Sequence, residues 1–221
     1  MKISPTAWLQ WVTATLAANA VVAALGLPLR LLWGWEEAFN SSAPVLYLAA
    51  TSGLAVGALQ WIVLWGRRLA GPLYVIATTL GFLPLMLVAT GPTDEGFRLG
   101  IVGAGGFSLR IIVDILILLL GFGLLLGSLQ ALTFRSTFGE AQKAFWVLTT
   151  VIGGMCGFFL AMIVQAPAIG VGNLYGSNYR SFYFFTVVNL FEFWTCVAAA
   201  QGIVLACKRY KRDYRLLAFG R

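Results

Sequence analysis

Long apolar stretches alternate with short polar segments along the whole chain. Six of these stretches are long enough to cross a bilayer, because about 20 apolar residues span ~30 Å of hydrocarbon as an α-helix. They cover residues 7–26, 45–65, 72–90, 111–132, 144–164 and 182–207. The sequence lacks the ten-residue segments of alternating hydrophobicity that are typical of a membrane β-barrel. The pattern therefore predicts an all-α integral membrane protein with six transmembrane helices.

Glutamine recurs at a nearly fixed interval inside three of these stretches. Gln60 and Gln130 are 70 residues apart, and Gln201 follows 71 residues later. The first two are preceded by glycines at the same two offsets, namely Gly53 and Gly57, and Gly123 and Gly127. On a helix these positions lie within about 60° of one another and form one stripe. The stripe is interpreted either as a polar seam that packs helices together, or as a ring of three glutamines that lines a polar site.

The intervening helices also resemble one another. Residues 73–78 match residues 145–150, and residues 11–15 give a shorter match. The second and third helices then form one unit, the fourth and fifth form another, and the sixth and first form a third that is joined only in space. This predicts a bundle of three parallel helix-pair repeats about a pseudo-threefold axis along the membrane normal, in a single transmembrane domain.

Charge is scarce and unevenly distributed. Charged residues make up 10% of the chain, against about 25% in a typical soluble domain. Eleven of the 15 basic residues fall on one side of the predicted spans, at the N-terminus, after the second and fourth helices, and in residues 208–221. This asymmetry predicts cytoplasmic termini. It also accounts for the net charge of +7 without a nucleic-acid partner. The basic cytoplasmic tail is expected to contact anionic lipid through Lys208, Arg209, Lys211, Arg212 and Arg215.

The segments between spans on the other side are expected to be loops. They cover residues 27–44, 91–110 and 165–181. Seven of the eight tryptophans lie near predicted helix ends, where aromatic side chains meet the membrane interface. These are Trp8, Trp11, Trp33, Trp35, Trp61, Trp65 and Trp146.

Two acidic residues lie within predicted spans, and an intramembrane carboxylate is a functional candidate by default. Asp114 lies near the outer end of its helix, four residues after Arg110, so a local ion pair also accounts for it. Glu192 lies ~15 Å deep, three residues after Asn189. It is either a neutral, hydrogen-bonded group or a group that faces a cavity. Both carboxylates lie opposite the glutamine stripe, and the four residues form a candidate ligand or ion site.

Several kinds of chemistry are excluded. The chain has no histidine, so ordinary haem ligation, histidine metal clusters and histidine-based catalytic triads are ruled out. Its three cysteines show no paired spacing, and no metal site is predicted. The sequence predicts no catalytic residues and no enzyme. A lipid or a lipophilic pigment held by a ligand other than histidine remains compatible with it.

The repeated unit is a Gly-x-x-x-Gly-x-x-Gln-x-x-x-Leu helix, a basic turn and an aromatic-led helix. It is carried by Gly53, Gly57, Gln60 and Leu64, with Phe134 in place of leucine in the second copy and Trp194 and Ala198 in place of the glycines in the third. It resembles uncharacterised bacterial membrane proteins with repeated hairpins of this kind, found in cyanobacteria and Chloroflexota. The resemblance implies a bacterial inner or thylakoid-type membrane and no established activity.

Two functions are therefore expected. In the first, the chain is a non-enzymatic accessory, assembly or interaction subunit of a membrane complex, with the bilayer and other membrane subunits as partners. In the second, it is a small solute-binding or transport subunit with a site in the outer half of the bundle, near Glu192.

Overall fold

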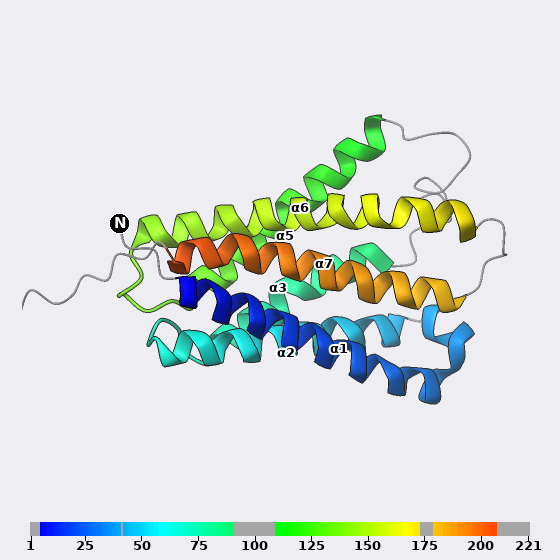
Figure 1. Ribbon diagram of the computed structural model, residues 1–221, viewed down its shortest axis with the longest axis horizontal. Helices are drawn as coiled ribbons and strands as arrows, with labels where there is room; N and C mark the ends of the chain where they lie inside the picture. Colours follow the sequence, from blue (N-terminus) through cyan, green and yellow to red (C-terminus); the bar gives the residue numbers. More distant parts are fainter. Residues whose placement is uncertain (1–4, 41, 91–108, 173–178, 207–221) are drawn as a thin grey trace, which may run out of the picture.

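The chain forms a bundle of α-helices (Figure 1). The structure is a computed structural model that describes residues 5–40, 42–90, 109–172 and 179–206, with side chains described mainly in 5–24, 49–84, 119–160 and 192–206. Within these ranges there are six helices: α1 (Pro5–Asn40), α2 (Ser42–Gly66), α3 (Leu73–Thr90), α5 (Leu109–Leu132), α6 (Glu140–Gly172) and α7 (Tyr179–Ala206).

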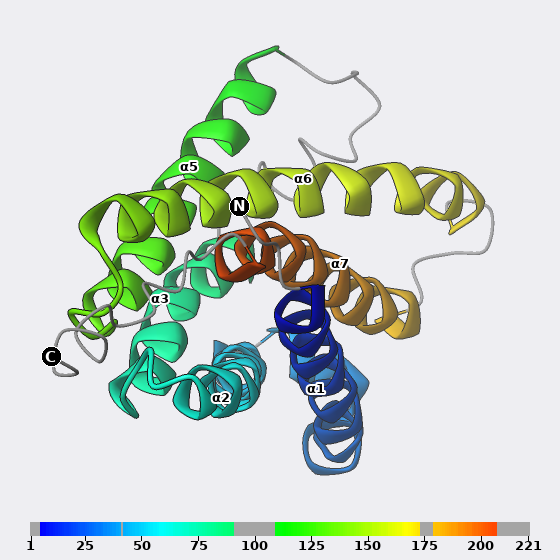
Figure 2. The same cartoon turned by 60° about the vertical axis from the view of Figure 1, so that its left-hand side comes forward.

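The helices form a closed ring. Each one contacts two neighbours, in the order α1, α2, α3, α5, α6, α7 and back to α1 (Figure 2). Along the long axis, α1, α3 and α6 run in one direction and α2, α5 and α7 in the other (Figure 1). Chain neighbours are thus antiparallel. The first and last helices of the ring lie side by side although they are far apart in sequence.

Two helices extend well beyond the predicted spans. α1 has 36 residues and α6 has 33, so at 1.5 Å per residue α1 is about 54 Å long, against ~30 Å of hydrocarbon. The prediction of loops at residues 27–44 and 165–181 is wrong over residues 27–40, 42–44, 165–172 and 179–181, which are helical. In residues 27–40 charged residues end the apolar stretch, but leucine, alanine and glutamate are good helix formers and let α1 continue. Residues 165–172 include Pro167, Gly170 and Gly172, so helix propensity does not explain why α6 continues.

The turns at one end of the bundle are joined to each other. Ala70 and Phe134 form an isolated antiparallel bridge, and the backbone N–H of Arg135 donates to the carbonyl of Leu69 at 2.9 Å. α2 ends with the paired bonds of a Schellman motif, in which Leu69 N–H reaches the Leu64 carbonyl and Arg68 N–H reaches the Trp65 carbonyl. Arg68 has φ 55°, the left-handed conformation that glycine usually supplies in this motif.

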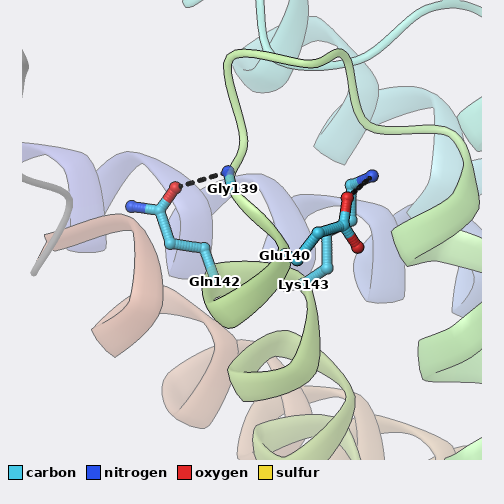
Figure 3. Close-up of polar contacts among 4 residues, drawn as sticks. All are labelled: Gly139, Glu140, Gln142 and Lys143. Atoms are coloured by element: carbon cyan, nitrogen blue, oxygen red, sulfur yellow. Dashed lines mark hydrogen bonds and ion pairs between the residues drawn. The ribbon is translucent and has the colours of Figure 1, made fainter.

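The start of α6 is capped by its own side chains (Figure 3). The Oε1 of Gln142 accepts a bond from the backbone N–H of Gly139 at 3.1 Å. Lys143 Nζ pairs with Glu140 Oε1 at 2.8 Å, one turn away. A glutamine that reaches back to the N-cap is half of a capping box, and an acidic residue in the first turn suits the helix dipole. These polar residues fix the point at which the chain enters α6.

Candidate functional site

Six uncharged polar side chains lie buried at one level of the ring. The three repeated glutamines are fully buried, on α2, α5 and α7. Three threonines on the intervening helices α1, α3 and α6 are also buried, at 1% exposure or less. We call this set the amide belt: Gln60, Gln130, Gln201, Thr15, Thr78 and Thr150. Burying so many polar groups is unfavourable unless each finds a hydrogen-bond partner, so their partners decide what the belt can do.

Each glutamine uses its Nε2 in the same way. Gln60 donates to Thr15 at 2.9 Å, Gln130 to Thr78 at 3.0 Å, and Gln201 to Thr150 at 2.7 Å. Each threonine hydroxyl in turn donates to the backbone carbonyl four residues earlier. These carbonyls belong to Trp11, Tyr74 and Trp146, at 2.8–3.1 Å. The three Gln–Thr bonds link three pairs of neighbouring helices, and the three threonine–carbonyl bonds lie within one helix each.

The glutamine oxygens are not equivalent. The Tyr74 hydroxyl donates to Gln60 Oε1 at 3.0 Å, and Trp146 Nε1 donates to Gln130 Oε1 at 3.1 Å. Gln130 Oε1 also accepts from Gln201 Nε2 at 2.9 Å. Among the residues that the structure describes, Gln201 Oε1 and Trp11 Nε1 are buried without a partner. The third glutamine therefore departs from the arrangement of the first two.

Aromatic side chains fill the centre of the helix ring on one side of the belt. The Trp11 centroid lies 5.3 Å from that of Trp146 and 6.4 Å from that of Tyr74, both edge-to-face. These residues belong to α1, α6 and α3, which are not neighbours in the ring, so their rings meet across its centre. The prediction of Trp11 and Trp146 as interfacial residues is wrong, since both are fully buried.

A second aromatic cluster lies on the other side of the belt. Phe82 on α3 lies 4.9 Å from Trp194 on α7, between ring centroids. Trp194 Nε1 also donates to Ser52 Oγ on α2 at 3.1 Å. Phe122 and Phe193 complete this cluster. Side chains therefore cross the centre of the ring above the belt, below it and, through the Gln201–Gln130 bond, within it.

The four glycines that precede the first two glutamines lie where helix backbones come closest. A β-carbon at Gly53 would lie 2.7 Å from the Cα of Thr79, and one at Gly57 3.1 Å from that of Val75. On α5 the corresponding distances are 2.8 Å from Gly123 to Val151 Cα and 2.9 Å from Gly127 to Val147 Cα. A β-carbon essentially never comes within 3.0 Å of another heavy atom. The glycines thus allow α2 to lie against α3, and α5 against α6, at distances that other residues would not.

Glu192 lies on α7, and its backbone carbonyl faces Gly157 of α6. Its side chain is partly exposed, and in the described part of the chain its Oε2 is buried with no hydrogen-bond partner. Arg110, Asp114 and Asn189 lie on α5 and α7, but their side chains are outside the described residues. The basic residues Lys208, Arg209, Lys211, Arg212 and Arg215 also lie outside them.

The partners of the glutamines were missed in the sequence. The match between residues 73–78 and 145–150 contains an aromatic residue followed four positions later by threonine, as Trp11 and Thr15 also do. That spacing puts the two side chains on one face of a helix. On α3 such a face serves two glutamines, because the Tyr74 hydroxyl bonds Gln60 and Thr78 bonds Gln130. The spacing of aromatic residue and threonine is therefore the sequence signal for these partners.

The polarity of the molecule is reversed relative to a soluble domain. Amides and hydroxyls occupy its centre, while large apolar side chains are exposed around it, such as Leu132 at 79%, Ile163 at 70% and Leu73 at 64%. Three stretches of the described helices are long and apolar enough to cross a membrane: Pro5–Ala24, Ala49–Gly66 and Glu140–Leu160. These features define a helical bundle of the membrane-associated class.

Beyond that class, similarity gives no further assignment. Comparison of the chain with protein-family models, with curated proteins and with solved structures found no match. In the portion of the chain that the structure describes, no three Cys, Asp or Glu side chains are grouped as metal ligands would be. Function must therefore be argued from the packing and the exposed faces themselves.

Proposed function

We propose that the chain is an integral membrane protein of six transmembrane helices, built from three helix-pair repeats about a pseudo-threefold axis. The three Gln–Thr bonds support the repeat, since each joins equivalent positions on consecutive helices of the ring. Two glycine contacts support it as well. Gly81 meets Leu126, four residues before Gln130, and Gly153 meets Val197, four residues before Gln201. The opposite directions of alternate helices agree with parallel pairs (Figure 1).

We propose further that it acts as a non-enzymatic accessory, assembly or interaction subunit of a membrane complex. The observation that carries this proposal is the filled centre of the ring. Side chains from non-neighbouring helices meet there at three levels, so the described part of the axis offers no open path. The surface available to other molecules is the exposed apolar exterior, which suits lipid and the apolar helices of other subunits.

Site-specific photocrosslinking in native membranes tests this function. A photoreactive side chain is placed at exposed Leu124, Leu148 or Ile62, and at buried Leu126 as a control. We expect a discrete heavier product at positions on one sector of the exterior and none at Leu126. Lipid adducts alone at every exposed position, together with a monomer in native mass spectrometry after mild extraction, contradict the proposal.

One observation favours the second function, a small solute-binding or transport subunit. Glu192 Oε2 is a buried carboxylate oxygen without a described partner, as expected of a group that takes a proton or a cation. Proteoliposomes with a pH-sensitive dye inside and an imposed Na⁺ or K⁺ gradient test it. An ion flux that is lost in Glu192→Gln and kept in Glu140→Gln, on the exposed end of α6, supports transport. Equal and negligible flux in the unsubstituted chain and in both variants rules out ion transport through Glu192.

A further inference from the structure

The hydrogen-bond chemistry of the belt fixes the orientation of Gln201. An indole N–H can only donate, so the atom of Gln130 that meets Trp146 Nε1 must be the amide oxygen. The atom of Gln201 that lies 2.9 Å from this oxygen must then be the amide nitrogen. The second bond of that nitrogen, to Thr150 at 2.7 Å, uses its other proton. Gln201 Oε1 is therefore directed away from both partners.

This leaves one acceptor and one donor unused at corresponding places. In the first two helix pairs, the aromatic residue at the equivalent position bonds the glutamine oxygen directly, as Tyr74 does with Gln60 and Trp146 with Gln130. By the same correspondence, Trp11 Nε1 is the atom that would donate to Gln201 Oε1 in the third pair. Both residues are fully buried, yet neither of these atoms has a partner in the described structure. Leaving buried polar groups unpaired is unfavourable, so both atoms favour a partner that fits between them.

The surroundings hold Trp11 away from a direct bond. Its ring is packed edge-to-face on Trp146 and Tyr74, and α1 is fastened to α7 one turn away, where Trp8 Nε1 donates to the Ala199 carbonyl at 3.0 Å. The Trp8 ring also occupies the space beside Gly202, where a β-carbon would lie 2.7 Å from Trp8 Cδ1. Moving Trp11 toward Gln201 would disturb both contacts. These contacts hold the Trp11 ring in place.

The two unused atoms also define what can bind. An indole N–H repels a cation and an amide oxygen repels an anion, and the belt contains no charged residue. A molecule that accepts from one and donates to the other must be neutral and carry both functions on one small group, which is the chemistry of a hydroxyl. Both residues are fully buried among packed side chains, so the bound group must be small. We propose that the belt holds a single structural water between Trp11 Nε1 and Gln201 Oε1, which completes the third helix pair.

Solution NMR of the indole N–H groups tests this directly. The full chain is labelled with ¹⁵N-indole tryptophan in nanodiscs, and its signals are assigned by single Trp→Phe variants. We expect a cross-peak between the Trp11 Hε1 proton and a long-lived water, and none at Trp146, whose indole bonds Gln130 directly. A Trp11 proton without a water cross-peak, or with a scalar coupling to the Gln201 side chain as in a direct bond, overturns the proposal.

A second variant separates the water from the fold. Gln201→Met removes the acceptor, and we expect it to abolish the Trp11 water cross-peak while the indole shift of Trp194, which bonds Ser52 outside the belt, is retained. If the variant does not fold, the Trp11 cross-peak of the unsubstituted chain decides the question, because its absence already overturns the proposal. Persistence of the cross-peak in Gln201→Met overturns the site. The inference depends on the belt alone, so its failure leaves the proposed subunit role untouched.

Discussion

The α2–α3 and α5–α6 pairs differ from the α7–α1 pair, although the same glutamine stripe runs through all three. In the first two, glycines bring the backbones into contact, and an aromatic residue bonds the glutamine oxygen. In the third, Trp194 and Ala198 replace the glycines, and Gln201 Oε1 has no partner among the described residues. The polar stripe therefore tolerates two kinds of packing, and the glycines decide which one occurs.

The third pair still has a close contact, but it is made by a side chain. The Trp8 ring fills the space beside Gly202, and its Nε1 reaches the Ala199 carbonyl. A backbone cannot yield to an added methyl group, whereas a half-buried side chain such as Trp8 can shift at the expense of its hydrogen bond to Ala199. The contrast leads to four predictions, each measured as the free energy of unfolding in mixed micelles.

The largest effect is expected from Gly127→Leu. Its β-carbon would lie 2.9 Å from the Val147 Cα, so α5 and α6 must separate. We expect a loss of about 3 kcal/mol or more. Gly202→Leu in the third pair should cost about half as much, because it displaces only the Trp8 side chain. Gly121→Leu, with no atom within 4 Å of its β-carbon, is the control. Equal losses at Gly127 and Gly121 would contradict the packing argument.

The glutamines should rank by the number of bonds that they make. Gln130 bonds Thr78, Trp146 and Gln201, whereas Gln60 bonds Thr15 and Tyr74. We expect Gln130→Met to cost about 2–3 kcal/mol and Gln60→Met about 1–2 kcal/mol, since each substitution leaves buried partners unpaired. A reversed order would mean that the belt is not the network described.

Tyr74→Phe should have a smaller effect. It removes one hydroxyl and leaves Gln60 Oε1 without its donor, so we expect a loss of about 1 kcal/mol. The same substitution in a Gln60→Met background should cost less than half of that, because the partner is already gone. If Tyr74→Phe costs the same stability in that background, its effect comes from the packing of the Tyr74 aromatic ring and not from the bond to Gln60.

The smallest effects are expected on the exterior. Leu124 on α5 and Ile203 on α7 are 46% and 49% exposed, and lipid replaces the atoms that an alanine removes. We expect both Leu124→Ala and Ile203→Ala to change stability by less than about 0.5 kcal/mol. If Ile203→Ala alone is strongly destabilising, exposed side chains of α7 contribute to the stability of the third pair as well as buried ones.

The sequence was sufficient for the helices and for the level of the glutamines, because apolar stretches and fixed spacings are local properties. It was insufficient for the end of α1, where charge marks the end of an apolar stretch but not the end of a helix, and for the end of α6, where a stretch with Pro167 and two glycines is nevertheless helical. It also missed the inward position of Trp11 and Trp146, since an aromatic residue near a helix end suits both an interface and a core. The replacement of two glycines by Trp194 and Ala198 was visible in the sequence, but its effect on Gln201 Oε1 was not, because that effect depends on how Trp11 packs against its neighbours.

The bond between Trp8 and Ala199 joins residues 191 positions apart, and this has a consequence for biosynthesis. At about 5–20 residues per second, a ribosome takes about 10–40 s to make the chain between them. During this interval α1 can have α2 as a partner but not α7, so the Trp8 indole lacks the Ala199 carbonyl that it bonds in the finished bundle. The ring closes only when its last helix arrives. A chain released before that moment would therefore expose the face of α1 that normally packs against α7, and would be more open to proteolysis.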